Sequence, residues 1–519
     1  MHIPRHMKIS LMGLLMLLIF VIMIPSVPHE IGFDSFFIHK LANIISVFGE
    51  ARWWIHPLSI FGLYPYSEVS GVPFILSGIS QCTNIDMEQA IWLFSVIIVL
   101  FSAFTAYLMA KVIRDDDVFK FFVAFGYSLS PGILAFTWNV STRGLFIVLL
   151  PLFIYLLLKA RTFKMRCGSL AIVMFIMLAV THHYIYFTGP VVLCFIILVL
   201  LNKFVKIRRT YSNLVNIGYL GIFLVAFSYP FFTYTFITEP RYQWLEWMLT
   251  TNVRYSGILI IFAITGFIYL SLKSNKNFGE KFILLTLLFL APFIYVRTYS
   301  HFFILIFVMT LAGIALANVA RTNERKKKHA CAVIIIALLL SVCFSGFYQH
   351  WRTGMYTGSR FWYMRESTYA GALWIRENVD ANKNLVGNGG TDSFRVQRMS
   401  AACGGLPLIF ETGVDALCYG FINKSYIKIK KNSALTTAFY LDGPYVEVRG
   451  TGIGIELNSF IGQPDIDRWY AKDFIDRFNI SYMIEDTSFN YPIIHSVREK
   501  KDNIYDNGEI RIWDLEKGG

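Results

Sequence analysis

The chain has 519 residues, of which 55% are hydrophobic and only 16% are charged. Soluble globular proteins carry roughly 25% charged residues, so this composition excludes a wholly soluble chain. The net charge of +13 does not indicate a nucleic-acid-binding protein, because the basic excess gathers in loops on one side of a series of apolar segments. Of the seven cysteines, Cys403 and Cys418 lie in the C-terminal third. The sequence leaves open whether they form a disulfide or stay two buried thiols.

Eleven charge-poor segments are predicted to cross the membrane as helices. They are 9–27, 89–110, 119–137, 143–158, 167–186, 189–202, 214–237, 256–272, 282–297, 299–320 and 329–347. The first follows a basic start and lacks a small-residue cleavage site, so we interpret it as an uncleaved signal anchor. Every loop expected on the inner side carries at least three Lys or Arg, which predicts a cytoplasmic N-terminus and an outward C-terminus. The predicted fold is a polytopic α-helical protein of the cell membrane.

Residues 1–348 are predicted to form the transmembrane domain, with a long outward loop at 28–88, and residues 349–519 an extracytoplasmic α+β domain. The predicted elements of this second domain are a helix at 366–378 and strands at 384–387, 406–410, 444–449, 480–485 and 509–515. Asn507-Gly508 lies between flanks of alternating apolar residues, a pattern typical of a hairpin turn.

The outward loop at 28–88 is predicted to contain an amphipathic helix. Its apolar positions recur at spacings of three and four: Phe37, Leu41, Ile44 or Ile45, and Phe48. Its polar positions are His39, Lys40, Asn43 and Ser46. A helix with this pattern is expected to lie in the membrane interface. The aromatic segment 238–255 is predicted to be interfacial as well, with Arg241 and Arg254 as solvated charges.

Two acids at the start of this loop are the candidate catalytic residues. Asp34 stands at the beginning of the amphipathic helix, where a polar substrate would meet lipid. A carboxylate there is partly desolvated, which suits it to act as a general base. The alternative is that Asp34 is the N-cap of the helix, since Asp is favoured at that position. Glu30 is a second candidate, and its alternative is an exposed loop acid.

Cationic and imidazole side chains at the ends of the predicted spans are candidates for binding a phosphate. They are Arg143, Arg297, His182, His183 and His301. Ionisable residues at such depth are costly to bury, so each is a functional hypothesis by default. The alternatives are snorkelling of the arginines to headgroups and packing of the histidines. The acidic run at 115–117 lies in an inward loop among basic residues, and we interpret it as a solvated turn rather than a metal site.

The first outward loop resembles that of the GT-C class of membrane glycosyltransferases, in particular the catalytic subunit of oligosaccharyltransferase. The resemblance rests on FDSFFIHKLANIISVFGEARWW followed by GLYPYSEVSG. The matching residues are Asp34, Ser35, Phe36, Phe37, Trp53, Trp54, Tyr64 and Pro65. FITE at 236–239 is similar to the Thr-x-x-Glu motif of that family's flexible outer loop, which implies that Glu239 binds substrate. The order of parts, a many-span body followed by an outward domain, matches over the whole chain.

Two departures from the oligosaccharyltransferase pattern bear on function. The WWDYG peptide-binding motif is absent, since the corresponding stretch reads NLVGNGGTDSFR at 384–395. The second acidic motif is also absent, and TWNVSTRGLF stands at its place, 137–146. The resemblance therefore implies a simpler sugar transferase, which takes a sugar from a polyprenyl (dolichyl) phosphate and passes it to a glycan, lipid or protein acceptor. It leaves open whether a divalent cation, Mg²⁺ or Mn²⁺, takes part.

Two other functions remain open at this point. One is a transporter or flippase of lipid-linked glycans, although no internal repeat of the kind common in transporters is visible. The other is an inactive relative that serves as an assembly subunit. Activity that depends on Asp34 would separate the transferase from both.

Overall fold

The computed structural model describes residues 3–516 apart from several gaps. The gaps are 64–66, 138, 205–211, 238, 297–299, 322–324, 356–363, 388–394, 412, 423–451, 462–464 and 488–493. Tyr64, Pro65, Arg297 and the strand predicted at 444–449 therefore lie outside the described residues. Contacts divide the chain into two compact units, each described by itself. The membrane unit is Met1–Ile24, Ser95–Trp138 and Arg143–Arg352, and the C-terminal unit is Pro25–Phe94, Asn139–Thr142 and Thr353–Gly519.

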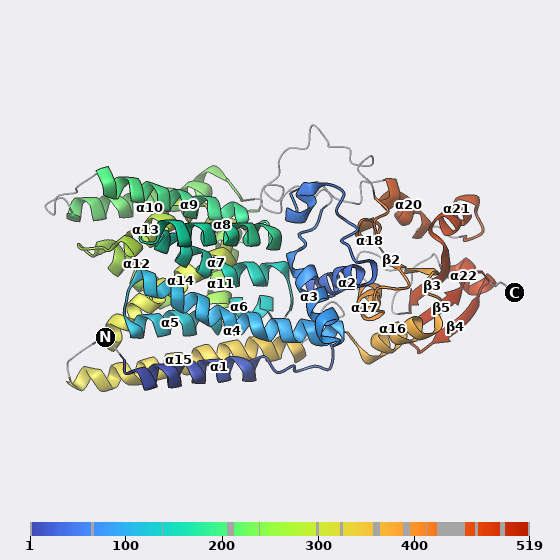
Figure 1. Cartoon of the computed structure of the whole chain (residues 1–519), viewed down its shortest axis with the longest axis horizontal. Coiled ribbons are helices and arrows are strands. Elements are labelled where there is room, and N and C mark those ends of the chain that lie inside the picture. The colour runs from blue at the N-terminus through green and yellow to red at the C-terminus, as the bar shows by residue number, and fades with distance from the viewer. Residues whose placement is uncertain are drawn as a thin grey trace. The chain divides into compact units, whose positions relative to one another are not determined.

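The membrane unit is built from apolar helices (Figure 1). They are α1 (Arg5–Ile22), α4 (Met87–Ile113), α5 (Asp117–Ser128), α6 (Pro131–Thr137), α7 (Thr142–Ala160), α8 (Lys164–Thr181), α9 (Ile185–Phe204), α10 (Ser212–Thr233), α11 (Arg241–Ser256), α12 (Leu259–Leu272), α13 (Phe278–Leu290), η3 (Ala291–Tyr295), α14 (Ser300–Ala320) and α15 (Arg325–Met355). In the described part of the chain, ten helices are long and apolar enough to cross a membrane, or up to eleven if α11 and α12 form one span bent by 101°. The predicted multi-pass membrane fold is confirmed.

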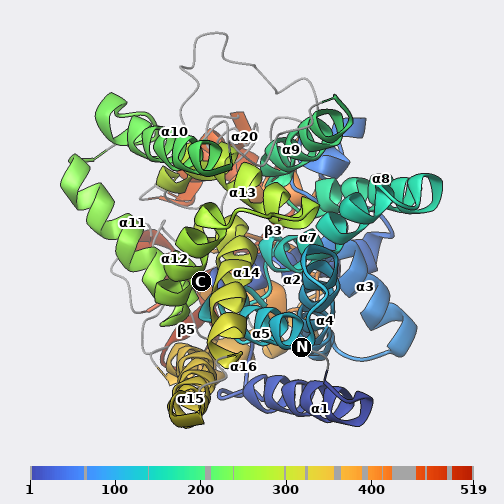
Figure 2. The same cartoon turned by 90° about the vertical axis from the view of Figure 1, so that its left-hand side faces the viewer.

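Helix α14 lies at the centre of the membrane unit (Figure 2). Its most apolar stretch is 89% buried, whereas those of α1, α8, α10 and α15 are only 11–17% buried although they too are apolar enough to cross a membrane. Helices that are apolar all round but exposed present those faces to lipid. Close packing on α14 depends on small residues, since a side chain at Gly266 of α12 would place its Cβ 2.0 Å from the Leu311 carbonyl oxygen. Glycine at such a crossing lets two helix backbones approach.

The run at 115–117 is only in part the predicted solvated turn, because Asp115 is exposed but the two aspartates after it are not. Asp116 and Asp117 are buried. Asp117 forms ion pairs of 2.7 Å with both Lys8 and Lys120, and Asp116 pairs with Arg321. The surrounding cations make burial of the carboxylates tolerable. The run ties α1 to α5 and to the residues that follow α14.

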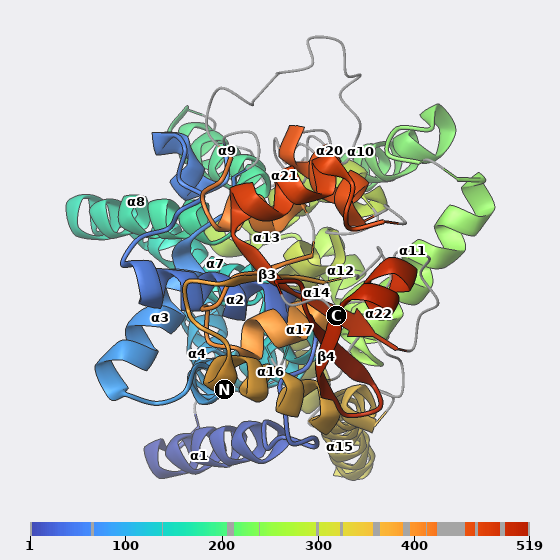
Figure 3. The same cartoon turned by 90° about the vertical axis from the view of Figure 1, so that its right-hand side faces the viewer.

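The C-terminal unit is an α+β structure, as predicted (Figure 3). Its elements, besides the first residues of α4, are α2 (Phe33–Phe48), η1 (Pro57–Phe61), α3 (Gly71–Thr83), α16 (Glu366–Asn378), β1 (Asn384–Gly387), α17 (Arg395–Ala402), β2 (Ile409–Phe410), α18 (Gly413–Cys418), α20 (Gly452–Ile461), α21 (Trp469–Phe478), β3 (Ile480–Asp486), α22 (Ile494–Lys500), β4 (Asp502–Asp506) and β5 (Ile510–Asp514). The sheet order is β2-β1-β3-β5-β4, parallel among β2, β1 and β3 and antiparallel among β3, β5 and β4. The predicted hairpin joins β4 to β5 through Gly508, whose φ of +85° suits glycine.

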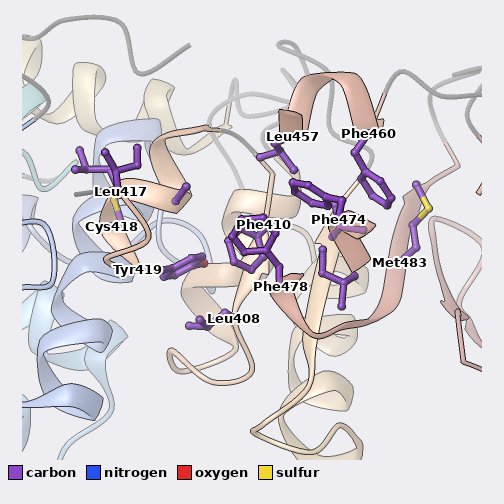
Figure 4. Close-up of a cluster of buried hydrophobic side chains, with 14 of the residues drawn as sticks. Leu408, Phe410, Leu417, Cys418, Tyr419, Leu457, Phe460, Phe474, Phe478 and Met483 are labelled. Carbon is purple, nitrogen blue, oxygen red and sulfur yellow. The ribbon is translucent and has the colours of Figure 1, made fainter. Parts of the chain in front are cut away.

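Helix α2 belongs to the interior of the C-terminal unit, so its predicted place in the membrane interface was wrong. Leu41, Ile44 and Trp53 join the apolar core that contains Phe410 and Phe478, and Figure 4 shows the C-terminal side chains of this core. The helix also packs on α3 and α17. Of its predicted polar positions, His39, Lys40 and Asn43 are buried together with the apolar ones. The open question about Cys403 and Cys418 is answered as well, because both are buried free thiols.

Candidate functional site

Asp34 lies in the first turn of α2 and is half-buried. The N-cap of this helix is Gly32, with no capping side chain, so the alternative that Asp34 serves as the N-cap is wrong. A negative charge in the first turn is favoured by the helix dipole. The position therefore places a carboxylate at the start of a helix without using it as a cap.

The backbone just before Asp34 packs closely against the segment that contains Asn139. Gly32 has φ +97°, and a Cβ there would lie 1.9 Å from Oδ1 of Asn139. Only glycine fits both the backbone angle and the space. Asn139 belongs to the TWNVSTRGLF stretch, so the structure brings that stretch beside the first loop, with an amide in place of an acid. Oδ1 of Asn139 is buried and has no hydrogen-bond partner in the described part of the chain.

Glu68 is a second carboxylate near Asp34, and the sequence analysis missed it. Desolvation raises the pKa of Glu68 to about 8, and the charge of Asp34 adds to the rise. The segment is fixed by Trp53, whose indole N–H lies 3.1 Å from the Glu68 carbonyl oxygen and 3.0 Å from Ser70 Oγ. Glu68 is the one acid between Glu50 and Asp86 in the sequence. A lone acid within GLYPYSEVSG, the stretch that resembles the GT-C class, could have marked Glu68 as a candidate site residue.

Glu30 is not an exposed loop acid, because it is 8% exposed and its carboxylate is engaged inside the unit. It accepts a hydrogen bond from Ser35 Oγ, and its other oxygen lies 2.6 Å from Nδ1 of His39. Both partners are on α2: Ser35 directly follows Asp34, and His39 lies about one helical turn further along. Glu30 therefore contacts the same helix as Asp34 but has its oxygens occupied.

The predicted phosphate-binding residues of the membrane unit gather where α7 begins, α8 ends and α14 begins. His182 and His183 are buried, with ring centroids 3.8 Å apart. His301 is buried in the first turn of α14. The charge of Arg143, in the first turn of α7, acts on both His182 and His301. Three of the residues proposed from sequence thus lie within electrostatic range of one another.

Helix α11 contributes aromatic side chains to this basic cluster. The ring of His301 stacks on Tyr255 at 4.7 Å and meets the edge of Trp247 at 6.5 Å. Arg254 is exposed, yet its charge also acts on His301, so it is more than a solvated loop charge. Glu239 is half-buried between α10 and α11. Arg297 lies outside the described residues.

No protein-family model matches the chain, and no curated protein matches its sequence. Solved structures do match, over both units. The archaeal oligosaccharyltransferase AglB from Archaeoglobus fulgidus, in complex with an inhibitory peptide and a dolichol-phosphate, has a TM-score of 0.57 at 12% identity, over 98% of this chain and 74% of that one. ArnT from Cupriavidus metallidurans, bound to undecaprenyl phosphate, has a TM-score of 0.53 at 12% identity, over 98% of both chains. The chain has the GT-C glycosyltransferase fold.

A third GT-C neighbour is the mycobacterial arabinofuranosyltransferase AftD, with a TM-score of 0.50 at 14% identity over 99% of this chain and 42% of that one. The three neighbours share the GT-C fold, and the names of two of them state different transferred groups, an oligosaccharide for AglB and an arabinofuranosyl group for AftD. Their likeness confirms the resemblance seen in the first loop. A fold hosts many activities, so the chemistry of this GT-C chain has to be argued from its own residues.

Proposed function

We propose that this protein transfers a sugar from a polyprenyl-phosphate donor to a glycan, lipid or protein acceptor. The observation that carries the proposal is an ionisable acid, Asp34, in the first turn of α2 with Glu68 beside it, in a chain of GT-C fold. Two neighbours of that fold hold a dolichol-phosphate and an undecaprenyl phosphate, respectively, which supports a lipid phosphate as the donor carrier.

In the proposed reaction, Asp34 takes the proton from an acceptor hydroxyl as its oxygen attacks the anomeric carbon. The new carbon–oxygen bond replaces the bond to the donor phosphate, which leaves with the electron pair. Arg143 and the imidazoles of His182 and His301 would bind this phosphate. Preorganised donors in a low-dielectric site stabilise the negative charge that develops on a leaving group.

We place the reaction on the outer face of the cell membrane. The positive-inside bias supports this side, since the loops joining α7 to α8 and α12 to α13 are rich in Lys and Arg. The residues proposed for catalysis and phosphate binding all belong to loops and helix ends on the side of the membrane opposite these basic loops. Donor and acceptor would therefore meet away from the cytoplasm.

We also propose that Mg²⁺ or Mn²⁺ assists. Mg²⁺ is usually held by one or two carboxylates together with substrate phosphates, and Asp34 with Glu68, whose proton the metal would displace on binding, supplies that minimum. Among the described residues, no group of three His, Cys, Asp or Glu is arranged to hold a metal, while the buried Asn139 Oδ1 offers a further oxygen. Transfer should fall with a chelator and return with Mn²⁺. Calorimetry with Mn²⁺ alone should show binding that Glu68→Gln weakens, and equal binding by both proteins would contradict the assignment.

The experiment that tests the function follows release of polyprenyl phosphate by purified protein given short-chain polyprenyl-phosphate sugars. Asp34→Asn should lower the rate by at least about 100-fold, because general-base catalysis contributes about that much. Arg143→Ala should lower it by about 100-fold through lost charge stabilisation. Asp86→Asn is the matched control, an exposed acid of the same loop, and should retain the wild-type rate. All variants should melt at the wild-type temperature.

Three outcomes would contradict the proposal. An Asp34→Asn variant of full activity would remove the catalytic base. Movement of the intact sugar lipid across liposomes, without bond cleavage, would indicate a flippase. Binding of the donor without turnover under every acceptor tested would indicate an inactive assembly subunit.

A further inference from the structure

Glu30 holds the first turn of α2 from outside the helix. Its carboxylate accepts a hydrogen bond from Ser35, the residue after Asp34, and contacts His39 one turn further on. Ser35 and His39 are 0% and 5% exposed. With both oxygens bound by buried partners, Glu30 would have to break these contacts to take a proton from an acceptor. Its geometry suits a residue that fixes the turn rather than one that reacts.

The segment that carries Glu30 is in turn attached to the first turn of α4. The backbone N–H of Glu30 donates to Oε1 of Glu88 at 2.7 Å. The same Glu88 oxygen lies 3.4 Å from Nδ1 of His29. Glu88 therefore holds two consecutive residues of the loop, one through the backbone and one through the side chain.

His29 continues these contacts to α16. Its Nε2 lies 3.2 Å from Oε1 of Glu366, the first residue of that helix, and its ring stacks on Tyr369 at 4.1 Å between centroids. The contact with Glu88 and then the contact with Glu366 raise the pKa of His29 against the effect of its burial. The two carboxylates favour the protonated form of His29, because contacts between an imidazolium and a carboxylate are charge-assisted.

We infer that Glu366, His29, Glu88 and Glu30 form a positioning chain that runs from α16 to the turn bearing Asp34. This inference rests on the proposed function, because it assigns the chain to the placement of the catalytic base. The outer end of the chain is exposed and the inner end is buried, since the Glu366 side chain is 73% exposed and the Glu30 side chain is 3% exposed. The inner contacts should therefore matter more than the outer one, since a lost partner is costlier when the group left behind is buried.

The test compares Glu30→Gln and Glu366→Gln with Glu377→Gln, which neutralises an exposed acid on the same helix α16 outside the chain. Glu30→Gln should lower kcat by about 10- to 100-fold with KM nearly unchanged, because small misplacements of a catalytic group cost rate rather than binding. Glu366→Gln should lower kcat about threefold or less, and Glu377→Gln not at all. The pH profile of Glu30→Gln should keep its wild-type shape, since the base is still present.

Hydrogen exchange keeps the inference separate from the proposed function. Backbone amides at 34–37 should exchange faster in Glu30→Gln and, less, in Glu366→Gln than in Glu377→Gln, whether or not transfer is detected. Unchanged exchange at these amides in Glu30→Gln would overturn the positioning chain even if the enzyme is active. Loss of the acidic limb of the pH profile in Glu30→Gln would overturn it as well, because the rate rises with pH through the pKa of the base, and Glu30 would then be that base. If the wild type shows no transfer but exchange at these amides is altered in Glu30→Gln, the proposed function is contradicted and the positioning chain is not.

Discussion

At the scale of single residues, the C-terminal unit holds two nearby carboxylates in different settings. Asp34 stands in the first turn of a helix, where the dipole favours its charge. Glu68 stands in a loop where desolvation and the charge of Asp34 raise its pKa to about 8. Neighbouring acids whose environments separate their protonation states are a recurring feature of enzyme sites. At neutral pH Glu68 is the protonated partner of the two.

The raised pKa of Glu68 predicts a pH window for stability. Between the usual value of 4.5 and about 8, the folded protein holds a proton that the unfolded chain releases, so the wild type loses stability as pH rises through this window. Glu68→Gln cannot ionise. Its melting temperature relative to wild type should therefore climb from about pH 4.5 to about pH 8 and then level off. Melting curves of both proteins at several pH values measure this, and a constant difference across the range would contradict it.

Sequence reasoning found the acid and the basic cluster but not their immediate partners. Asp34, Arg143, His182 and His301 were visible because charged residues at the ends of apolar spans are rare. Glu68 and Asn139 gave no such signal, because a single polar residue in a loop has no periodicity to interpret. Their relevance comes from folding, which brings 139–142 and the loop around Glu68 to the start of α2.

At the scale of elements, α2 is tied to α18 by a fully buried ion pair. Lys40 and Asp415 are 2% and 3% exposed and contact each other directly, with the rings of Phe37 and Tyr419 about the ammonium group. Burying two charges costs as much as their attraction returns, so such a pair adds little net stability. What it provides is a single orientation of the helix.

This ion pair predicts a non-additive pair of variants. Lys40→Met should destabilise the C-terminal unit by about 3–5 kcal/mol, because it leaves the Asp415 charge buried without its counter-charge. Lys40→Met combined with Asp415→Leu should recover most or all of the loss. Lys500→Met, which removes a half-exposed surface pair with Asp467, is the control and should change little. Thermal unfolding in detergent measures these three variants and Asp415→Leu alone, and simple additivity of the two core substitutions would contradict the interpretation.

The elements were predicted unequally well for a physical reason. Spans follow from long apolar runs, and the β4–β5 hairpin follows from Asn507-Gly508, so local sequence suffices for both. The extent of α2 was also predicted, because its spacing is local. Its surroundings were not, since Lys40 and Asn43 have buried partners in distant parts of the chain. Asn43, for instance, donates to the Ala401 carbonyl at 2.8 Å.

At the scale of the whole molecule, orientation in the membrane is the prediction that remains to be measured. Every second loop between the spans is rich in Lys and Arg, including 159–166 between α7 and α8. The positive-inside rule places such loops in the cytoplasm. The C-terminal unit would then face outward.

Single cysteines test this orientation in whole cells, in a protein whose exposed Cys82 is replaced by serine. Lys472→Cys, on the exposed surface of α21, should react with a membrane-impermeant maleimide added from outside. Arg161→Cys, exposed in the loop after α7, should react only after the cells are permeabilised. The reverse pattern would invert the topology and move the proposed reaction to the cytoplasmic face.

The ion pair between α2 and α18 also has a consequence for biosynthesis. Its partners are 375 positions apart in the chain, so at about 5–20 residues per second a ribosome makes Lys40 roughly 20 to 75 s before Asp415. During that interval the helix exists without its counter-charge and without the apolar core that later encloses it. The nascent loop must wait, solvated or held by a chaperone, until translation is nearly finished.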